Sequence, residues 1–179
     1  MTTSEVHNLC MKYNINNYTI NDDMSISVEG DVNLPHKNLK SLPIKFKEVG
    51  GYFYCYNNQL TSLEYCPETV DGDFSCSNNQ LTSLKYCPET VGGDFFCSYN
   101  QITNFDGLPE FFEQPIYLYG NPVHEIYKLF KEDHRCIYWI REFGVIQGDE
   151  VVRDRLEEVY HTLGMDIPNN ISLKEYILV

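Results

Sequence analysis

The chain repeats itself every 21 residues, and this period constrains the fold more than any other feature of the sequence. The run from Asn78 to Leu84 recurs almost unchanged from Asn57 to Leu63. The same step relates several sets of residues: Phe53, Phe74 and Phe95; Cys55, Cys76 and Cys97; Asn58, Asn79, Asn100 and Asn121; Pro67, Pro88 and Pro109. A short unit cannot bury its own apolar side, so a fixed period of this length predicts a solenoid of stacked coils.

Each unit contains residues that alternate as in a short β-strand. Phe95 and Cys97 alternate with polar or outward positions and are expected to point inward. A glycine precedes each strand and is expected to provide the tight turn into it: Gly30, Gly51, Gly72 and Gly93. Asn100 marks the bend that follows, and because an Asn side chain both donates and accepts, a column of them can bridge neighbouring coils. Pro109 is expected to keep the return segment extended or 3₁₀-like.

The unit resembles the leucine-rich repeat, with Cys where Leu is usual. Phe95 to Ile102 has the form apolar-x-apolar-x-x-Asn-x-apolar. The segment from Ser77 to Leu84, with its Pro-bearing return, is similar to the short repeats of secreted bacterial effectors of the YopM and IpaH type. It is also similar to small repeat proteins of bacteriophages and giant viruses. The resemblance implies an α/β solenoid: a short leucine-rich-repeat coil with a parallel β-sheet on its concave side. A repeat of this kind carries no information about chemistry.

The period divides the chain into three parts. Residues 32–122 are expected to form four 21-residue units plus a final strand. Residues 1–31 predict an N-terminal cap, in which a helix beginning at Ser4 is followed by a hairpin of Tyr18–Ile20 and Ser25–Val28 that covers the open sheet edge.

Residues 123–179 predict a C-terminal α-helical cap. Three apolar stripes at helical spacing occur in this segment. Asn121 is expected to be the N-cap of the first helix, Asp133 opens the second, and Gly164 closes the third.

Charge and cysteine content limit the classes of function. The net charge of −13 argues against binding to a nucleic-acid backbone and suits a basic protein partner. The seven cysteines occupy apolar slots or stripes and include no Cys-x-x-Cys pair, so they predict buried free thiols, no metal site and no cofactor. We therefore expect a cytoplasmic protein with no signal peptide and no membrane span.

The same analysis predicts no enzyme. Effectors of the IpaH type carry a nucleophilic Cys in a Cys-x-Asp motif, whereas Cys136 is followed by Ile137 and Tyr138 and lies on an apolar stripe. The five histidines are scattered, and the sequence holds no Gly-rich phosphate loop. No catalytic residue is predicted.

The outward strand positions form the predicted binding surface. In a leucine-rich repeat these positions line the concave face, where polar residues are usual. Here many are aromatic, with Asp beside them, and the predicted partner-binding residues are Tyr52, Tyr54, Tyr56, Asp73, Asp94, Phe96, Tyr99, Tyr117 and Tyr119. Aromatics also suit strands in general, which is the simpler explanation. Clustered exposed aromatics favour an interface, and the carboxylates favour a partner that carries Lys or Arg.

Three functions remain open at this stage. The first is a non-catalytic protein-interaction module, which the resemblance places in a phage or pathogen that inhibits or redirects a host protein, such as a defence component. The second is an acidic mimic of nucleic acid, which needs carboxylates spaced as a stripe. The third is a ligand-sequestering protein, which needs a closed polar cavity. The oligomeric state stays open.

Overall fold

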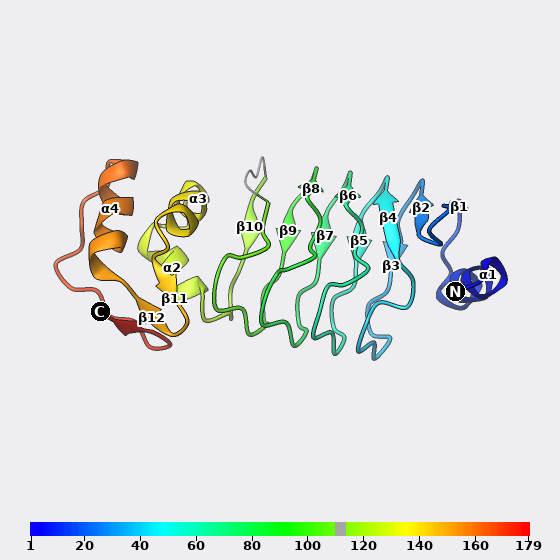
Figure 1. Ribbon diagram of the computed structural model, residues 1–179, viewed down its shortest axis with the longest axis horizontal. Coiled ribbons are helices and arrows are strands. Elements are labelled where there is room, and N and C mark those ends of the chain that lie inside the picture. The colour runs from blue at the N-terminus through cyan, green and yellow to red at the C-terminus, as the bar shows by residue number, and fades with distance from the viewer. Residues whose placement is uncertain (110–113) are drawn as a thin grey trace.

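The computed structural model describes residues 1–109 and 114–179. It is a β-solenoid of about four turns with repeats of about 21 residues, and its helices lie outside the coil (Figure 1). The two termini lie at opposite ends of the long axis (Figure 1). The predicted solenoid and its period are therefore confirmed.

One parallel sheet consists of the strands that the alternation predicted. Its members, in spatial order, are β10 (Ile116–Tyr117), β9 (Phe95–Phe96), β7 (Phe74–Ser75), β5 (Phe53–Tyr54) and β3 (Val32–Asn33). Each residue pairs with the one 21 positions further along, as Phe53 does with Phe74 and Phe74 with Phe95. Residues that occupy the same position of the 21-residue repeat are therefore paired partners in the sheet.

A second sheet runs along the return segments, and the sequence analysis did not predict it. Its order is β1 (Tyr18–Ile20), β2 (Ile26–Val28), β4 (Phe46–Val49), β6 (Thr69–Val70) and β8 (Thr90–Val91). All its pairs are parallel except β1 with β2, which form the predicted hairpin. The returns are extended, as expected, but their pairing into a sheet was not predicted, and Thr-Val dipeptides suit such a sheet.

The core lies between the two sheets. Phe53, Phe74 and Phe95 form a continuous row of rings, with centroids 5.9 and 5.0 Å apart. Cys55, Cys76 and Cys97 are fully buried beside them, and all seven cysteines are free thiols. Burial raises the pKa of the Cys55 thiol to about 12, so these thiols pack as small apolar groups.

The expected asparagine column is present. The Asn79 amide donates hydrogen bonds to the carbonyls of Cys55 and Cys76, at 3.1 and 2.9 Å, and its oxygen accepts from the backbone N–H of Leu60 at 2.9 Å. Asn100 and Asn121 repeat this pattern one and two turns later. Each asparagine therefore ties its own turn to the preceding one.

Three of the four glycines before the strands, Gly51, Gly72 and Gly93, allow close approach between turns, whereas Gly30 has open space around it. The N–H of Gly72 donates to the carbonyl of Gly51 at 2.9 Å, and a Cβ on Gly72 would lie 3.0 Å from the Gly51 backbone. None of the four glycines is among those with positive φ. The tight spacing of the coils, and not a left-handed turn, therefore explains why glycine occupies this position of the repeat.

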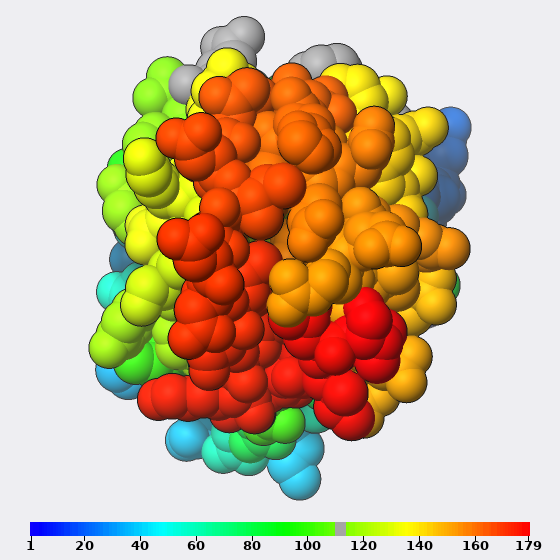
Figure 2. Space-filling view, turned by 90° about the vertical axis from the view of Figure 1, so that its left-hand side faces the viewer, coloured from blue at the N-terminus to red at the C-terminus, as the bar shows by residue number. Residues whose placement is uncertain are grey.

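The helices and a small third sheet lie at the two ends of the coil. Helix α1 (Thr3–Tyr13) precedes the hairpin. After the coil come α2 (His124–Leu129), α3 (Arg135–Glu142) and α4 (Arg153–Leu163). Strands β11 (Ile146–Gln147), β12 (Glu150–Val151) and β13 (Ile177–Leu178) form the third sheet, which was not predicted. Figure 2 shows this C-terminal end, over which residues after the coil are spread.

Two helix starts differ from the expectation. Asn121 is not the N-cap of α2, since its side chain bonds within the asparagine column and Val123 occupies that position. Helix α3 begins at Arg135, and Asp133 accepts a hydrogen bond from the Arg135 N–H at 3.0 Å. Gly164 does close α4, in a left-handed conformation with φ 67°.

Candidate interaction surfaces

The register of the first sheet places the predicted binding residues on one face. Tyr54, Ser75, Phe96 and Tyr117 are paired partners on β5, β7, β9 and β10. They alternate with buried phenylalanine and isoleucine, so they point away from the core. Ser75 separates Tyr54 from Phe96 and is itself 7% exposed. The predicted surface consequently divides into groups.

The first aromatic group consists of Tyr52, Tyr54 and Tyr56. The Tyr52 and Tyr54 rings are stacked with centroids 4.2 Å apart, and Tyr56 is tilted against Tyr54 at 5.8 Å. The His36 ring meets Tyr56 edge-on at 6.0 Å. These rings hold one another in place while each side chain stays partly exposed.

Asp73 holds this group in position. One of its oxygens accepts a hydrogen bond from the Tyr54 hydroxyl at 3.2 Å, and the other accepts from the Asp94 N–H at 3.0 Å. Burial, and then the charge of Asp73, raise the pKa of Tyr54, so the phenol stays a hydrogen-bond donor at neutral pH. Asp73 thus stabilises the turn through its hydrogen bond from Asp94 and also lies at the surface beside Tyr54. Asp31 similarly accepts from the Tyr52 N–H at 3.1 Å.

The second aromatic group is the pair Phe96 and Tyr117. Their rings are stacked, with centroids 4.7 Å apart and planes 10° apart. Tyr117 is 42% exposed and Phe96 is half-buried. Asp94 comes two residues before Phe96, just ahead of β9, and is half-buried.

The third aromatic group lies at the junction with the C-terminal residues. The Tyr99 and Tyr119 rings meet edge-on at 5.3 Å, and Tyr119 meets His124 of α2 at 5.5 Å. These residues line a groove of about 900 Å³, and α2 together with Ser172, Lys174 and Glu175 of the tail contributes the rest of the lining outside the repeats. The repeat pattern could not predict this groove, because part of its lining comes from α2 and the tail, which lie outside the repeats.

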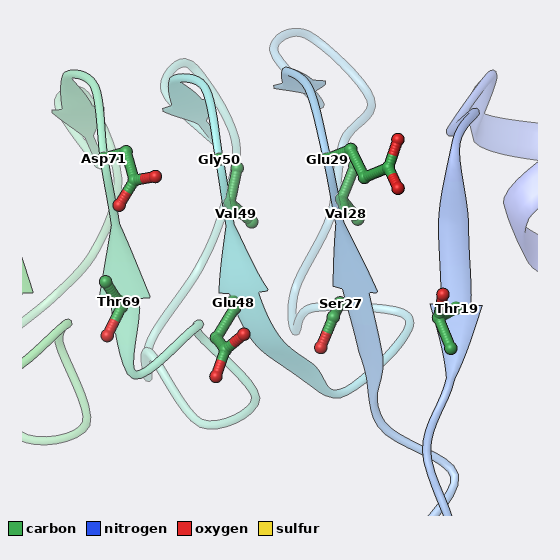
Figure 3. Close-up of a pocket in the computed structure, with 9 residues that line it drawn as sticks. All are labelled: Thr19, Ser27, Val28, Glu29, Glu48, Val49, Gly50, Thr69 and Asp71. Atoms are coloured by element: carbon green, nitrogen blue, oxygen red, sulfur yellow. The ribbon is translucent and has the colours of Figure 1, made fainter.

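A hollow on the second sheet is another surface feature that the sequence did not predict. Its volume is about 480 Å³, and Figure 3 shows its lining. Thr19, Ser27, Glu48 and Thr69 are paired across neighbouring strands. Glu29 and Asp71 stand above them, but Gly50 and Gly92 occupy the alternate turns of that column. The carboxylates therefore form no continuous stripe there.

In the described residues, no side-chain cluster suits a metal ion, and the thiol of Cys136 is shielded from solvent. Within residues 1–109 and 114–179, no group of three His, Cys, Asp or Glu side chains could hold a metal ion. The Cys136 thiol is buried, and burial raises its pKa, which lowers its reactivity. Among the helices of these residues, none combines the length and apolar character needed to span a bilayer.

Comparison with known proteins yields no match to a protein-family model, a curated protein or a solved structure. The chain is therefore described by its fold alone, as a β-solenoid with 21-residue repeats.

Proposed function

We propose that this chain is a non-catalytic protein-interaction module that binds its partner with the outward face of the first sheet. The carrying observation is the set of ordered aromatic pairs, Tyr52 with Tyr54 and Phe96 with Tyr117, left partly exposed on a strand face. Rigid tyrosine rings supply contact area at low entropic cost, and neighbouring Ser and Asn supply adaptable hydrogen bonds. Surfaces of this composition suit protein recognition.

We also propose that the repeats are of the leucine-rich type, capped by residues 1–31 and 123–179. The inward Phe and Cys positions and the asparagine column support this assignment, since both follow the 21-residue register. Helix α1 and the C-terminal helices lie at the two ends of the coil, where capping is needed for solubility (Figure 1).

The partner in this proposal is a protein surface that carries Lys or Arg. The net charge of −13 favours such a surface at long range. The resemblance of the repeats supports a phage or pathogen product that inhibits or redirects a host protein, and seven unbridged thiols suit a reducing cytoplasm. The nucleic-acid mimic is less well supported, because Gly50 and Gly92 interrupt the acidic column of the second sheet.

The test compares three proteins as bait in the native host. They are the wild type, a face variant with Tyr54, Phe96 and Tyr117 changed to Ala, and a control variant with Tyr65, Tyr86 and Tyr138 changed to Ala. The control tyrosines are 46%, 54% and 40% exposed and lie off this face. Proteins captured on each bait are quantified by mass spectrometry, and the affinity of the best candidate is measured by calorimetry.

The expected result is one protein that binds the wild type and the control equally and the face variant at least ~30-fold more weakly, as for a buried aromatic hot spot worth ~2 kcal/mol. Equal binding of the face variant, with its fold intact by circular dichroism, would refute the proposal. It would direct attention to the second sheet or to the C-terminal residues.

A further inference from the structure

A groove lies between the last turn of the coil and the C-terminal residues. Its volume of about 900 Å³ lies within the ~300–1,000 Å³ range of small-molecule sites. Its lining includes Tyr99 and Tyr119 of the repeats, together with Lys128 of α2 and Lys174 of the tail. Tyr54, Phe96 and Tyr117 do not line it.

The aromatic wall is held in a fixed geometry. The Tyr99 ring lies against the backbone of Gly120, where an added Cβ would come within 2.7 Å of it. Gly120 also has a φ of 75°, which favours glycine. Edge-on contacts from Tyr99 to Tyr119 and from Tyr119 to His124 fix the ring planes. Both tyrosines nevertheless remain more than half exposed, at 53% and 59%.

One carboxylate, that of Glu125, attaches the tail residues of the groove to α2. Glu125 accepts hydrogen bonds from the backbone N–H groups of Lys174 and Glu175, at 2.7 and 3.1 Å, through the same oxygen. Tyr176 adds a hydrogen bond from its hydroxyl to the carbonyl of Thr103. The tail is therefore fixed against both α2 and the repeats, and the groove does not depend on a loose segment.

The charges of the lining are balanced. Two lysines, Lys128 and Lys174, are matched by two glutamates, Glu125 and Glu175. Gln101 and Ser172 add neutral groups that can both donate and accept. A strongly charged ligand would meet repulsion from one of these pairs, whereas a neutral ligand with many donors and acceptors would meet only complementary groups.

We propose that this groove binds a neutral sugar, with one apolar face of a pyranose ring packed on Tyr99 or Tyr119. A sugar hydroxyl donates one hydrogen bond and accepts others, which matches the ammonium, carboxylate, amide and hydroxyl groups that line the groove. The C–H face of the ring matches an exposed, rigid phenol ring. The site does not use Tyr54, Phe96 or Tyr117, through which the proposed protein binding is tested, so either proposal can fail alone.

The experiment is saturation-transfer NMR on the full chain with defined probes. The sugars are the methyl glycosides of glucose, galactose, mannose and N-acetylglucosamine, together with maltose and cellobiose. Adenosine monophosphate and a mixture of short peptides represent charged and peptide ligands. The variants are Tyr119→Ala and Lys128→Ala, and the matched control is Tyr117→Ala, an exposed tyrosine two residues away and outside the groove.

We expect transfer to at least one sugar, at least fivefold weaker binding of that sugar to Tyr119→Ala, and unchanged binding to Tyr117→Ala. Lys128→Ala is expected to weaken binding as well, and it tests the site if Tyr119→Ala fails to fold. No transfer to any sugar, preferential transfer to the nucleotide or the peptides, or equal loss in Tyr117→Ala would each overturn the proposal.

Discussion

The asparagine column gives the sharpest test of how the coils are held together. Replacing Asn79 by Ala removes its hydrogen bonds to Cys55, Cys76 and Leu60 in a site where Asn79 is 9% exposed. The two carbonyls keep a second donor each, because Asn58 also bonds to the Cys55 carbonyl and Asn100 to that of Cys76. The Leu60 N–H keeps no other acceptor among the described residues.

The expected loss of unfolding free energy depends on which of these backbone groups keep a hydrogen-bond partner. Leaving one buried N–H unsatisfied costs about 1–3 kcal/mol, and each lost bond whose partner stays satisfied costs about 0.5–1 kcal/mol. Asn79→Ala should therefore lower the free energy of unfolding by about 3 kcal/mol. The control is Gln80→Ala, whose side chain is exposed and whose backbone N–H bonds to the Leu60 carbonyl irrespective of the side chain. It should change stability by less than about 0.5 kcal/mol.

Urea unfolding followed by circular dichroism measures both changes. The midpoint should fall in Asn79→Ala with little change of slope, since the surface exposed on unfolding is the same. A loss below about 1 kcal/mol, or a loss equal to that of Gln80→Ala, would refute the argument that the column bridges the turns.

Three further outcomes are expected. Cys55 and the other strand thiols should resist alkylation by iodoacetamide at pH 8 until urea unfolds the chain, and mass spectrometry showing rapid native labelling would contradict their burial. Gly72→Ala should cost about 1–3 kcal/mol in urea unfolding, whereas Gly30→Ala, which has open space, should be near neutral; equal effects would refute the close-approach argument. The hydrogen bond from Lys45 lowers the pKa of Asp23, so its stabilisation is present above the usual carboxyl pKa and is lost as pH falls through the lowered value. The stability deficit of Asp23→Asn should thus shrink in acid, and a constant deficit between pH 7 and pH 2 would count against this pairing.

The sequence predicted the first sheet and its core because identical slots carry identical physical demands. The slots of Phe74 and Cys76 are apolar and buried in every unit, since each side chain must fill the same space between the same neighbours. Asn79 repeats because the same backbone groups need a partner in every turn. The binding face is less regular, since outward positions carry no such demand.

The second sheet was not predicted, although its residues also follow the 21-residue step, as Thr69–Val70 and Thr90–Val91 do. These strands begin two residues after Pro67 and Pro88, and proline favours an irregular return over a paired strand. The junction groove escaped for another reason. Its wall depends on Glu125 bonding to residues about 50 positions later, and no local pattern signals such a contact.

The division of the aromatic surface could not be predicted either. Tyr52 stacks on Tyr54 and Phe96 on Tyr117, whereas Tyr99 and Tyr119 turn toward the groove. These choices depend on side-chain rotamers, and on Ser75 occupying the position between the first two groups.

The asparagine column has a consequence for how such a chain can change in length. Asn79 and Asn100 each bond to their own turn and the one before, through the same four kinds of backbone group. Every internal junction is therefore chemically equivalent, and a whole 21-residue unit could be duplicated or removed without creating a new kind of contact. Recombination between the near-identical segments around Asn57 and Asn78 would lengthen or shorten the exposed faces in steps of ~4.8 Å, one strand spacing at a time.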